Sequence, residues 1–292
     1  MEGSLSNLQN LDLKNSTADD VRKILVQLPV SFLTFKILPN VVISRARKGR
    51  DYRTAKETTY CPIEYCKNIQ RATLANDTMF YGVLSDDQEH LENARAICVS
   101  ECSALARSGR ESVGREYFCI SQWLVKEPLN VVSFIADNTY EDVVDNALLN
   151  QLRALFIKNH QNDYSLESIE LARYISKDFS KLVVDNHDYL ISATLANDCI
   201  HGMGYDGIVY PSVQLGGQAG LNIALSPTAV DEKLDFWRVL GHGYYKNKEH
   251  GIVRIERVSV NGQPFQMVEN ITDECICKEL NVTQLENLKI WD

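Results

Sequence analysis

The sequence lacks an apolar run long enough to cross a lipid bilayer, which takes about 20 consecutive apolar residues. Its longest apolar stretch, residues 21–43, is interrupted by charged residues and prolines, namely Arg22, Lys23, Pro29, Lys36 and Pro39. The chain also begins without the basic segment and following apolar segment that are typical of a secretory signal. We therefore expect a cytoplasmic protein that does not insert into a membrane.

An excess of positive charge is absent as well. The 292 residues include 30 Lys and Arg against 39 Asp and Glu, which gives a formal net charge of -9. Proteins that coat nucleic acid or bind anionic membranes are usually steered by an overall basic charge, so we do not expect nucleic acid as a partner. A basic cluster does occur at Arg45, Arg47, Lys48, Arg50 and Arg53, and its simplest interpretation is a solvated loop.

Cysteine spacing typical of a zinc site is missing, although the chain contains 8 cysteines. Cys61 and Cys66, and likewise Cys275 and Cys277, lack a second pair at the spacing of a zinc ribbon. In a reducing compartment cysteines stay as thiols and behave mainly as small apolar residues. We predict no metal site and no bound cofactor.

The common local signatures of enzymes are also absent. The sequence contains no G-x-G-x-x-G before a helix, no G-x-x-x-x-G-K-[ST], no G-x-S-x-G and no H-E-x-x-H. Cys199 and His201 are close in sequence, but a thiolate–imidazole pair needs adjacency in space. An enzyme with this sequence would therefore use none of these motifs.

Segments typical of strands and helices alternate without a regular β-α-β order, which predicts an α+β fold rather than a doubly wound sheet. Strands are predicted at residues 33–47 with a break at Pro39, then at 78–84, 117–125, 130–136, 207–210 and 221–225, followed by a hairpin that turns at Asn261-Gly262. Helices are predicted at residues 17–29, at 85–107 from a capping box at 85–88, at 141–158, 165–181 and 188–200, and in a short last helix capped by Thr283. The first sixteen residues are polar, and we expect them to be loosely ordered.

Glu101 stands out within the predicted helix that ends at residue 107. Ala94, Ile97, Cys98 and Cys102 follow the spacing of a buried helical stripe, and Glu101 lies on the same stripe. A buried carboxylate costs several kcal/mol of desolvation unless it has partners or faces a cleft. Glu101 is therefore either a residue at the edge of the stripe that reaches water or an arginine, or a functional carboxylate.

Arg71, Tyr81 and Ser212 are further candidates on chemical grounds. Arg71 lies in a polar segment before a predicted strand, where its planar guanidinium would suit two phosphate oxygens. Tyr81 in that strand would stack on a flat heterocycle, and Ser212 ends another strand, where its hydroxyl would meet a ligand. Each residue also has an ordinary interpretation, as a surface arginine, a core tyrosine and a turn serine.

Taken together, these segments resemble the RES-domain family, which is named for its arginine, glutamate and serine. The resemblance runs from about residue 38 to 240. It rests on ISRAR at 43–47, on Arg71 ten residues before Tyr81, on ARAICVSE ending at Glu101, and on YDGIVYPS ending at Ser212 with GLNIAL after it. The arginine is flanked differently here, as Gln-Arg-Ala-Thr, and the interval between Tyr81 and Glu101 is longer than in the compact form of the family.

The resemblance implies an ADP-ribosyltransferase-like fold, with a split mixed β-sheet core and flanking helices. It divides the chain into an N-terminal extension with a short helix at 1–37, a RES-like catalytic domain at 38–240, and a hairpin with a short helix at 241–292 that packs on the same domain. Several members of the family are toxins that deplete NAD⁺ by hydrolysis or phosphorolysis and are restrained by an antitoxin. NAD⁺ would thus be the substrate rather than a cofactor, and an antitoxin or a second copy of the chain remains an open partner.

The resemblance also implies a role for each candidate residue. The Glu101 carboxylate would stabilise the positive charge that develops on the ribose as nicotinamide leaves. Arg71 would hold a phosphate of the dinucleotide, Tyr81 would stack on nicotinamide, and Ser212 would bind the ribose or the carboxamide. Arg45 or Arg47 would assist at the pyrophosphate, with Arg45 favoured.

Two other functions remain open at the level of the sequence. One is an ADP-ribosyltransferase that moves ADP-ribose from NAD⁺ to a protein or nucleic acid. The other is a catalytically silent module that binds nucleic acid or another partner through the basic cluster at 45–53. Binding of the second kind would weaken steeply with salt and would not need Glu101.

Overall fold

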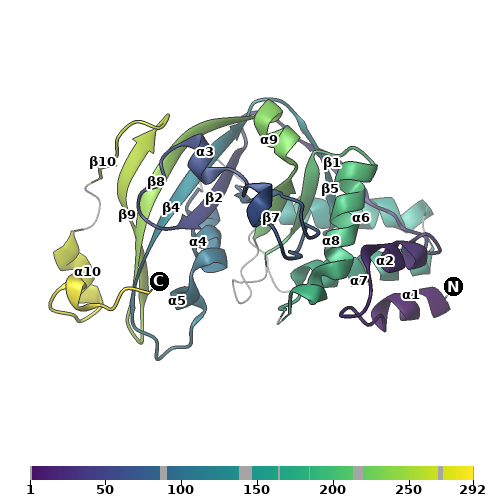
Figure 1. Ribbon diagram of the computed structural model, residues 1–292, viewed down its shortest axis with the longest axis horizontal. Coiled ribbons are helices and arrows are strands. Elements are labelled where there is room, and N and C mark those ends of the chain that lie inside the picture. The colour runs from purple at the N-terminus through teal and green to yellow at the C-terminus, as the bar shows by residue number, and fades with distance from the viewer. Residues whose placement is uncertain are drawn as a thin grey trace. The chain divides into compact units, whose positions relative to one another are not determined.

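The structure is a computed structural model that describes residues 2–85, 91–137, 147–163, 165–183, 185–212, 220–268 and 272–291. Its contacts divide the chain into two compact units. Unit 1 comprises Met1–Pro39, Tyr60–Tyr81 and Val125–Leu234, and unit 2 comprises Asn40–Thr59, Gly82–Leu124 and Asp235–Asp292. Both units contain strands and helices, which confirms the α+β class (Figure 1). The ADP-ribosyltransferase-like arrangement and the boundaries at 37 and 240 stay predictions.

Unit 1 combines a four-stranded mixed sheet with most of the helices. Its helices are α1 (Glu2–Gln9), α2 (Ala18–Leu25), α6 (Ala147–Asp163), α7 (Leu166–Ser180), α8 (Leu190–Asn197) and α9 (Pro227–Lys233), and its shorter turns are η1 (Ile63–Tyr65), η2 (Asn186–Tyr189) and the π-helical η3 (Asp198–Gly202). The strands follow the order β1 (Leu33–Ile37), β5 (Leu129–Ser133), β6 (Gly207–Pro211) and β7 (Leu221–Leu225). β5 and β6 are parallel, whereas the other two pairs are antiparallel.

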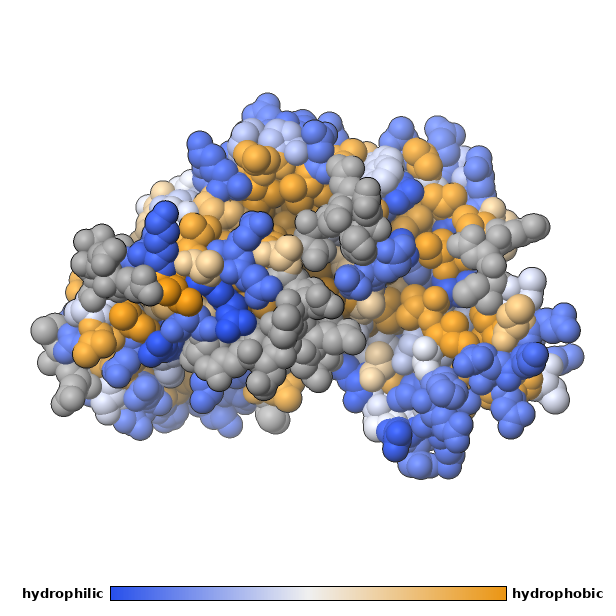
Figure 2. Space-filling view, turned by 180° about the vertical axis from the view of Figure 1, so that it is seen from behind, coloured by the Kyte–Doolittle hydropathy of each residue, from blue (hydrophilic) through white to orange (hydrophobic). Residues whose placement is uncertain are grey.

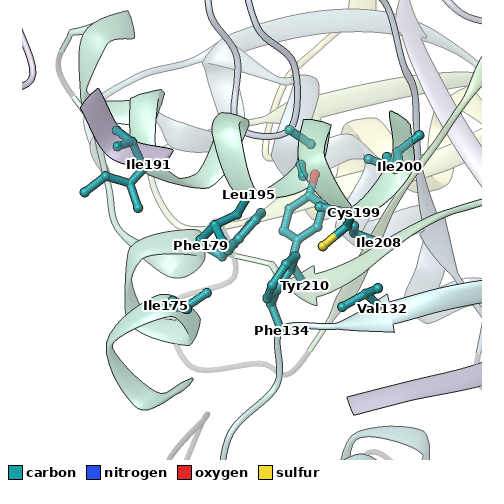
Figure 3. Close-up of a cluster of buried hydrophobic side chains, with 14 of the residues drawn as sticks. Val132, Phe134, Ile175, Phe179, Ile191, Leu195, Cys199, Ile200, Ile208 and Tyr210 are labelled. Carbon is teal, nitrogen blue, oxygen red and sulfur yellow. The ribbon is translucent and has the colours of Figure 1, made fainter. Parts of the chain in front are cut away.

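The core of unit 1 lies between this sheet and helices α2, α7 and α8. Every residue of β6 and β7 is buried, as expected for strands covered on both faces. The rings of Phe134, Phe179 and Tyr210 meet in this core, with Phe134 stacked on Phe179 at 4.3 Å between ring centroids (Figure 3). The core therefore joins the end of β5, the end of α7 and β6.

Unit 2 is built on a largely antiparallel sheet. Its strands follow the order β3 (Phe80–Leu84), β2 (Val42–Lys48), β4 (Gly114–Val125), β8 (Leu234–Lys246), β9 (Gly251–Val260) and β10 (Gln266–Met267), where the first residues of β3 and β8 and the last of β4 belong to unit 1. Its helices are α3 (Ala55–Thr58), α4 (Leu91–Cys102), α5 (Ala104–Arg107) and α10 (Asp273–Glu279), with a 3₁₀ turn η4 at Leu285–Asn287. Helix α4 packs on β2, since the thiol of Cys98 donates to the carbonyl oxygen of Ser44 at 3.4 Å.

Two local predictions are confirmed in detail. Thr17 caps α2, because its side chain accepts from the backbone N–H of Asp20 while the Asp20 carboxylate accepts from the backbone N–H of Thr17. Asn261 and Gly262 both adopt positive φ, at 49° and 75°, and the N–H of Gln263 donates to the carbonyl oxygen of Val260 at 3.0 Å. A two-residue hairpin turn with left-handed central residues needs this geometry.

Other local predictions are wrong. The first sixteen residues are not loose, because α1 forms there and Leu8 is buried. The helix predicted to reach residue 107 is interrupted at Ser103, which caps the N-terminus of α5. Thr283 does not cap a last α-helix, since only the 3₁₀ turn η4 follows it, whereas α10 was not predicted. Residues 86–88 of the predicted capping box and residues 141–146 of the helix predicted at 141–158 lie outside the described ranges.

Hydrophobic residues on the face seen in Figure 2 occur in groups that are separated by hydrophilic ones. A folded protein commonly exposes apolar atoms in this way. Within the described part of the chain, no helix combines the length and the apolar character that a membrane span requires.

Candidate functional site

Arg71 holds the C-terminal end of α7. Its Nη1 donates to the carbonyl oxygen of Phe179 at 2.5 Å, and its Nη2 donates to the carbonyl oxygen of Lys181 at 3.1 Å. The guanidinium also lies over the ring of Tyr189, with 4.8 Å between its central carbon and the ring centroid. The last carbonyl groups of a helix have no partner inside the helix and carry partial negative charge, so a cation is favourable there. Arg71 is thus a half-buried structural residue of unit 1 as well as a candidate for phosphate binding.

Tyr81 fixes the segment that follows Arg71. Its hydroxyl oxygen accepts from the backbone N–H of Ala72 at 3.2 Å and forms a short hydrogen bond with the hydroxyl of Thr73. The ring is half-buried and packs against the core of unit 1. The structure therefore brings Tyr81 next to the loop that carries Arg71.

Ser212 directly follows β6 and is buried, with 1% of its surface exposed. Its backbone N–H donates to the carbonyl oxygen of Gly220 at 2.8 Å, while the residues between them lie outside the described ranges. Two positions earlier, Tyr210 packs on Phe179 at 5.6 Å between ring centroids (Figure 3). Because the Phe179 carbonyl accepts from Arg71, strand β6 before Ser212 and the anchor of Arg71 share one packed cluster.

Glu101 lies in the last turn of α4, in unit 2. Its side chain is half-buried, and its backbone carbonyl accepts from Nη1 of Arg107 at 2.5 Å. The predicted stripe is buried at Ala94, Ile97 and Cys98, whereas Cys102 is only half-buried. Glu101 therefore occupies the exposed end of a buried stripe, where its carboxylate is only partly desolvated.

Arg45 and Glu101 act on the same thiol. Burial is the largest effect that raises the pKa of Cys102, the charge of Arg45 opposes this rise, and the charge of Glu101 adds to it. The thiol of Cys102 also donates to the carbonyl oxygen of Ala46 on β2 at 3.6 Å. Arg45 and Glu101 thus lie in the same part of unit 2.

Among the predicted residues, Arg71, Tyr81 and Ser212 belong to unit 1, whereas Arg45 and Glu101 belong to unit 2.

The basic cluster at 45–53 has partners within unit 2. Lys48 forms an ion pair with the buried Glu116 at 3.1 Å. Arg50 lies 3.5 Å from the ring centroid of Tyr117, and Nη2 of Arg47 donates to the carbonyl oxygen of Thr59 at 3.2 Å. The ion pair offsets one positive charge, and the other two contacts hold Arg47 and Arg50 within unit 2. These contacts favour a structural role over nucleic-acid binding.

The structure offers neither a thiolate nucleophile at Cys199 nor a set of metal ligands in the part of the chain that it describes. Burial raises the pKa of Cys199 to about 12. Nε2 of His201 lies 3.2 Å from Oδ2 of Asp77, so this imidazole has a carboxylate partner instead. Across the described ranges, no three His, Cys, Asp or Glu side chains gather where they could bind a metal ion.

The residues that hold Arg71 were not found from the sequence. Phe179 and Tyr189 are 108 and 118 positions away from it in the chain. A backbone carbonyl has no sequence signature, and Tyr189 carried no motif that would single it out. Only the packing of α7 and η2 in unit 1 reveals these partners.

Comparison with known proteins does not extend the sequence resemblance. No protein-family model matches the chain, and no curated protein matches it at a significant level. The resemblance to the RES-domain family therefore stays a prediction, which rests on the short motifs around Arg71, Tyr81, Glu101 and Ser212.

Proposed function

We propose that this protein degrades NAD⁺ by cleaving the bond between nicotinamide and ribose, with water or phosphate as the acceptor. The observation that carries the proposal is the hydrogen bond from the Ala72 N–H to the Tyr81 hydroxyl, which couples the tyrosine to the loop of Arg71. Ser212 follows strand β6, which packs on the same aromatic cluster. Three of the predicted site residues, Arg71, Tyr81 and Ser212, thus belong to one connected part of unit 1.

Arg71 would bind a phosphate of NAD⁺ while it holds α7. A guanidinium has five N–H donors, and the described contacts of Arg71 are three, to two carbonyl groups and the Tyr189 hydroxyl. A phosphate oxygen is a strong acceptor for the remaining donors. On this proposal, Tyr81 would stack on nicotinamide, Ser212 would bind the ribose or carboxamide, and Arg45 would assist at the pyrophosphate.

Glu101 would act at the reacting carbon. Departure of nicotinamide leaves positive charge on the ribose ring, and a fixed carboxylate stabilises that charge and can orient the acceptor. The position of Glu101 supports this role, because α4 is anchored on β2 by the thiols of Cys98 and Cys102 while the carboxylate stays half-buried. A carboxylate at the end of a helix that packs on the sheet is held in place, which suits a residue that must act at one atom of the substrate.

Nicotinamide release from NAD⁺ tests this function directly. The purified protein is incubated with NAD⁺, with and without added phosphate, and nicotinamide is quantified by chromatography. Release without phosphate indicates hydrolysis, and release that depends on phosphate indicates phosphorolysis. If NAD⁺ labelled in its adenylate part marks a protein or nucleic acid instead, the enzyme is an ADP-ribosyltransferase. Absence of release under all these conditions would contradict the proposal.

Two matched variants on α4 identify the catalytic carboxylate. Glu101→Gln should reduce nicotinamide release by at least about 100-fold, because the amide cannot balance the positive charge of the transition state. Glu92→Gln is the control, since Glu92 lies on the same helix with 69% of its side chain exposed. Equal activity of both variants, at unchanged thermal stability, would remove Glu101 from the mechanism.

A role as a toxin can be tested in cells. Induced expression should lower the cellular NAD⁺ content and stop growth, whereas Glu101→Gln should do neither. An antitoxin would then be a protein whose co-expression restores growth and that binds the purified chain. Normal growth with a wild-type chain that is active in vitro would rule out a toxin.

A further inference from the structure

Strand β1 is the outermost strand of the sheet in unit 1. It pairs with β5 on one side, where Leu33–Ile37 lie antiparallel to Leu129–Ser133, and among the described residues no strand pairs with its other side. The edge of a sheet exposes backbone N–H and C=O groups that can bond to a further strand. The hydrogen bonds of β5 determine which residues of β1 expose these groups.

Phe134, directly after β5, fixes the directions of the backbone groups. Its N–H donates to the carbonyl oxygen of Val209 on β6 at 2.8 Å, so the backbone groups of the preceding residue, Ser133, point toward β1. Ser133 lies opposite Leu33. Because bonded and non-bonded residues alternate along an antiparallel pair, every second residue of β1 from Leu33 onward bonds to β5, and the residues between them point outward.

Thr34 and Lys36 are the outward residues of β1. Both are exposed, and their backbone N–H and C=O groups have no hydrogen-bond partner within the described part of the chain. The strand thus offers the backbone donors and acceptors of both residues at an edge that solvent reaches.

The sequence of β1 is complementary to itself in one antiparallel register. With Phe35 opposite Phe35 of a second copy, Leu33 lies opposite Ile37, and Thr34 lies opposite Lys36. Apolar residues then meet apolar residues, and the two Phe35 side chains come into the close contact of a pair without backbone hydrogen bonds. Thr34 and Lys36 form the hydrogen-bonded pairs of this register.

Lys36 decides between this register and its neighbours. A lysine commonly protects a sheet edge against pairing. A register centred on Lys36 would place two ammonium groups directly opposite each other, which is destabilising. In the register centred on Phe35, Lys36 lies opposite the neutral Thr34, and the two Lys36 side chains are only diagonal neighbours.

We propose that β1 pairs with β1 of a second copy of the chain in this register, through the backbone groups of Thr34 and Lys36. A strand of five residues buries less surface than the roughly 1,200 Å² of a stable interface, so the dimer should form only at high protein concentration. The proposal does not depend on NAD⁺ cleavage, because it uses none of the residues assigned to that reaction.

Sedimentation of the full chain, from micromolar to millimolar concentration, measures the dimer, and amide hydrogen exchange followed by NMR locates it. The amides of Leu33, Phe35 and Ile37 should exchange slowly at every concentration, because they bond to β5. The amides of Thr34 and Lys36 should exchange fast in the dilute chain and more slowly as the dimer forms. A chain that stays monomeric at millimolar concentration, or slow exchange of Thr34 and Lys36 in the dilute chain, would overturn the proposal.

Two substitutions of the exposed Thr34 test the register. Thr34→Glu places a carboxylate opposite Lys36 of the second copy and should tighten the dimer by about threefold or more, whereas Thr34→Lys places like charges opposite each other and should weaken it to a similar extent. An unspecific contact predicts the opposite order, because the chain has a net charge of -9 and a further carboxylate adds to the repulsion between two copies. That opposite order, or equal dimerisation of the two variants, would contradict the proposal. Both variants should release nicotinamide at the wild-type rate in dilute solution, so the two proposals can fail independently.

Discussion

Arg71 donates from Nη1 to the carbonyl oxygen of Phe179 at 2.5 Å while its guanidinium lies over the ring of Tyr189. The residue that we propose for phosphate binding thus also closes the C-terminal end of α7. A loss of activity on its replacement would be ambiguous, because either the substrate contact or the fold could be responsible. The two roles separate when the charge is kept and the shape of the side chain is changed.

We expect Arg71→Ala to lower the free energy of unfolding by about 1–3 kcal/mol, since the partly buried carbonyl groups of Phe179 and Lys181 at the end of α7 would lose this donor. Arg71→Lys keeps a cation near the helix end, so this variant should lose less free energy of unfolding than Arg71→Ala. Lysine lacks the planar fork that binds phosphate oxygens, so the KM of Arg71→Lys for NAD⁺ should rise while kcat changes little. Urea unfolding and steady-state kinetics measure the two effects.

Tyr189→Leu is the control for the structural role. It removes the ring under Arg71 and should lower stability by about 0.5–1 kcal/mol without changing the KM for NAD⁺. A wild-type KM for Arg71→Lys would mean that Arg71 serves only to hold α7.

Glu116 explains why the helix predicted to reach residue 107 is interrupted. Its buried carboxylate accepts from the hydroxyl of Ser103 and from the backbone N–H of Leu105 at 3.3 Å, and it pairs with Lys48 at 3.1 Å. Removal of Lys48 leaves an uncompensated charge that is fully buried, whereas removal of Glu116 leaves an ammonium group on a side chain that is 35% exposed. We therefore expect Lys48→Met to lower the free energy of unfolding by about 3 kcal/mol and Glu116→Gln to lower it by about 1–2 kcal/mol, as measured by urea unfolding. A larger loss for Glu116→Gln than for Lys48→Met would show that the ion pair is hydrated.

The cysteines should differ strongly in their reactivity. Burial raises the pKa of Cys119 to about 11 and the pKa of Cys199 to about 12, whereas Cys275 is exposed. Since the thiolate is the reactive form, iodoacetamide at mildly alkaline pH should label Cys275 first and should label Cys199 only after unfolding. Peptide mass spectrometry measures the order, and fast labelling of Cys199 in the folded protein would contradict its burial.

The local part of the fold could be predicted because single residues fix it. Thr17 and Asp20 cap α2, Pro39 separates β1 from β2, and Asn261-Gly262 makes the hairpin turn. The errors occurred where distant residues decide the outcome. Leu8 is ordered by packing against the core of unit 1, although the segment around it is polar.

The local surroundings of the candidate residues were predictable to the same extent. The spacing of Arg71 and Tyr81 brings together a loop and the strand after it, and the helical period placed Glu101 at the end of a buried stripe. The sequence could not indicate that Phe179 and Lys181 would hold Arg71, because backbone carbonyls act there.

The stability of unit 2 should depend on pH through His242. Its ring is buried, its Nδ1 lies 3.0 Å from the carbonyl oxygen of Leu240, and its Nε2 has no hydrogen-bond partner. Burial, with the charge of Arg95 adding to it, lowers the pKa of His242 from 6.5 to about 4, against the opposing effects of the Leu240 carbonyl and Glu256. The folded protein therefore favours the neutral form of the His242 imidazole.

The sign of the pH effect follows from the two pKa values. Between pH 6.5 and 4 the unfolded chain binds a proton at His242 that the folded chain does not bind, so stability is complete above pH 6.5 and falls as the pH drops toward 4. The difference in pKa corresponds to a loss of about 3 kcal/mol. Urea unfolding across this range should show the fall for the wild type and for His250→Gln, an exposed control, but a flatter profile for His242→Gln. Carboxylates titrate near the lower end of the range in all three proteins, so the effect of His242 is the difference between the stability profile of His242→Gln and the other two. Identical profiles would mean that the buried imidazole accepts a proton in the folded state.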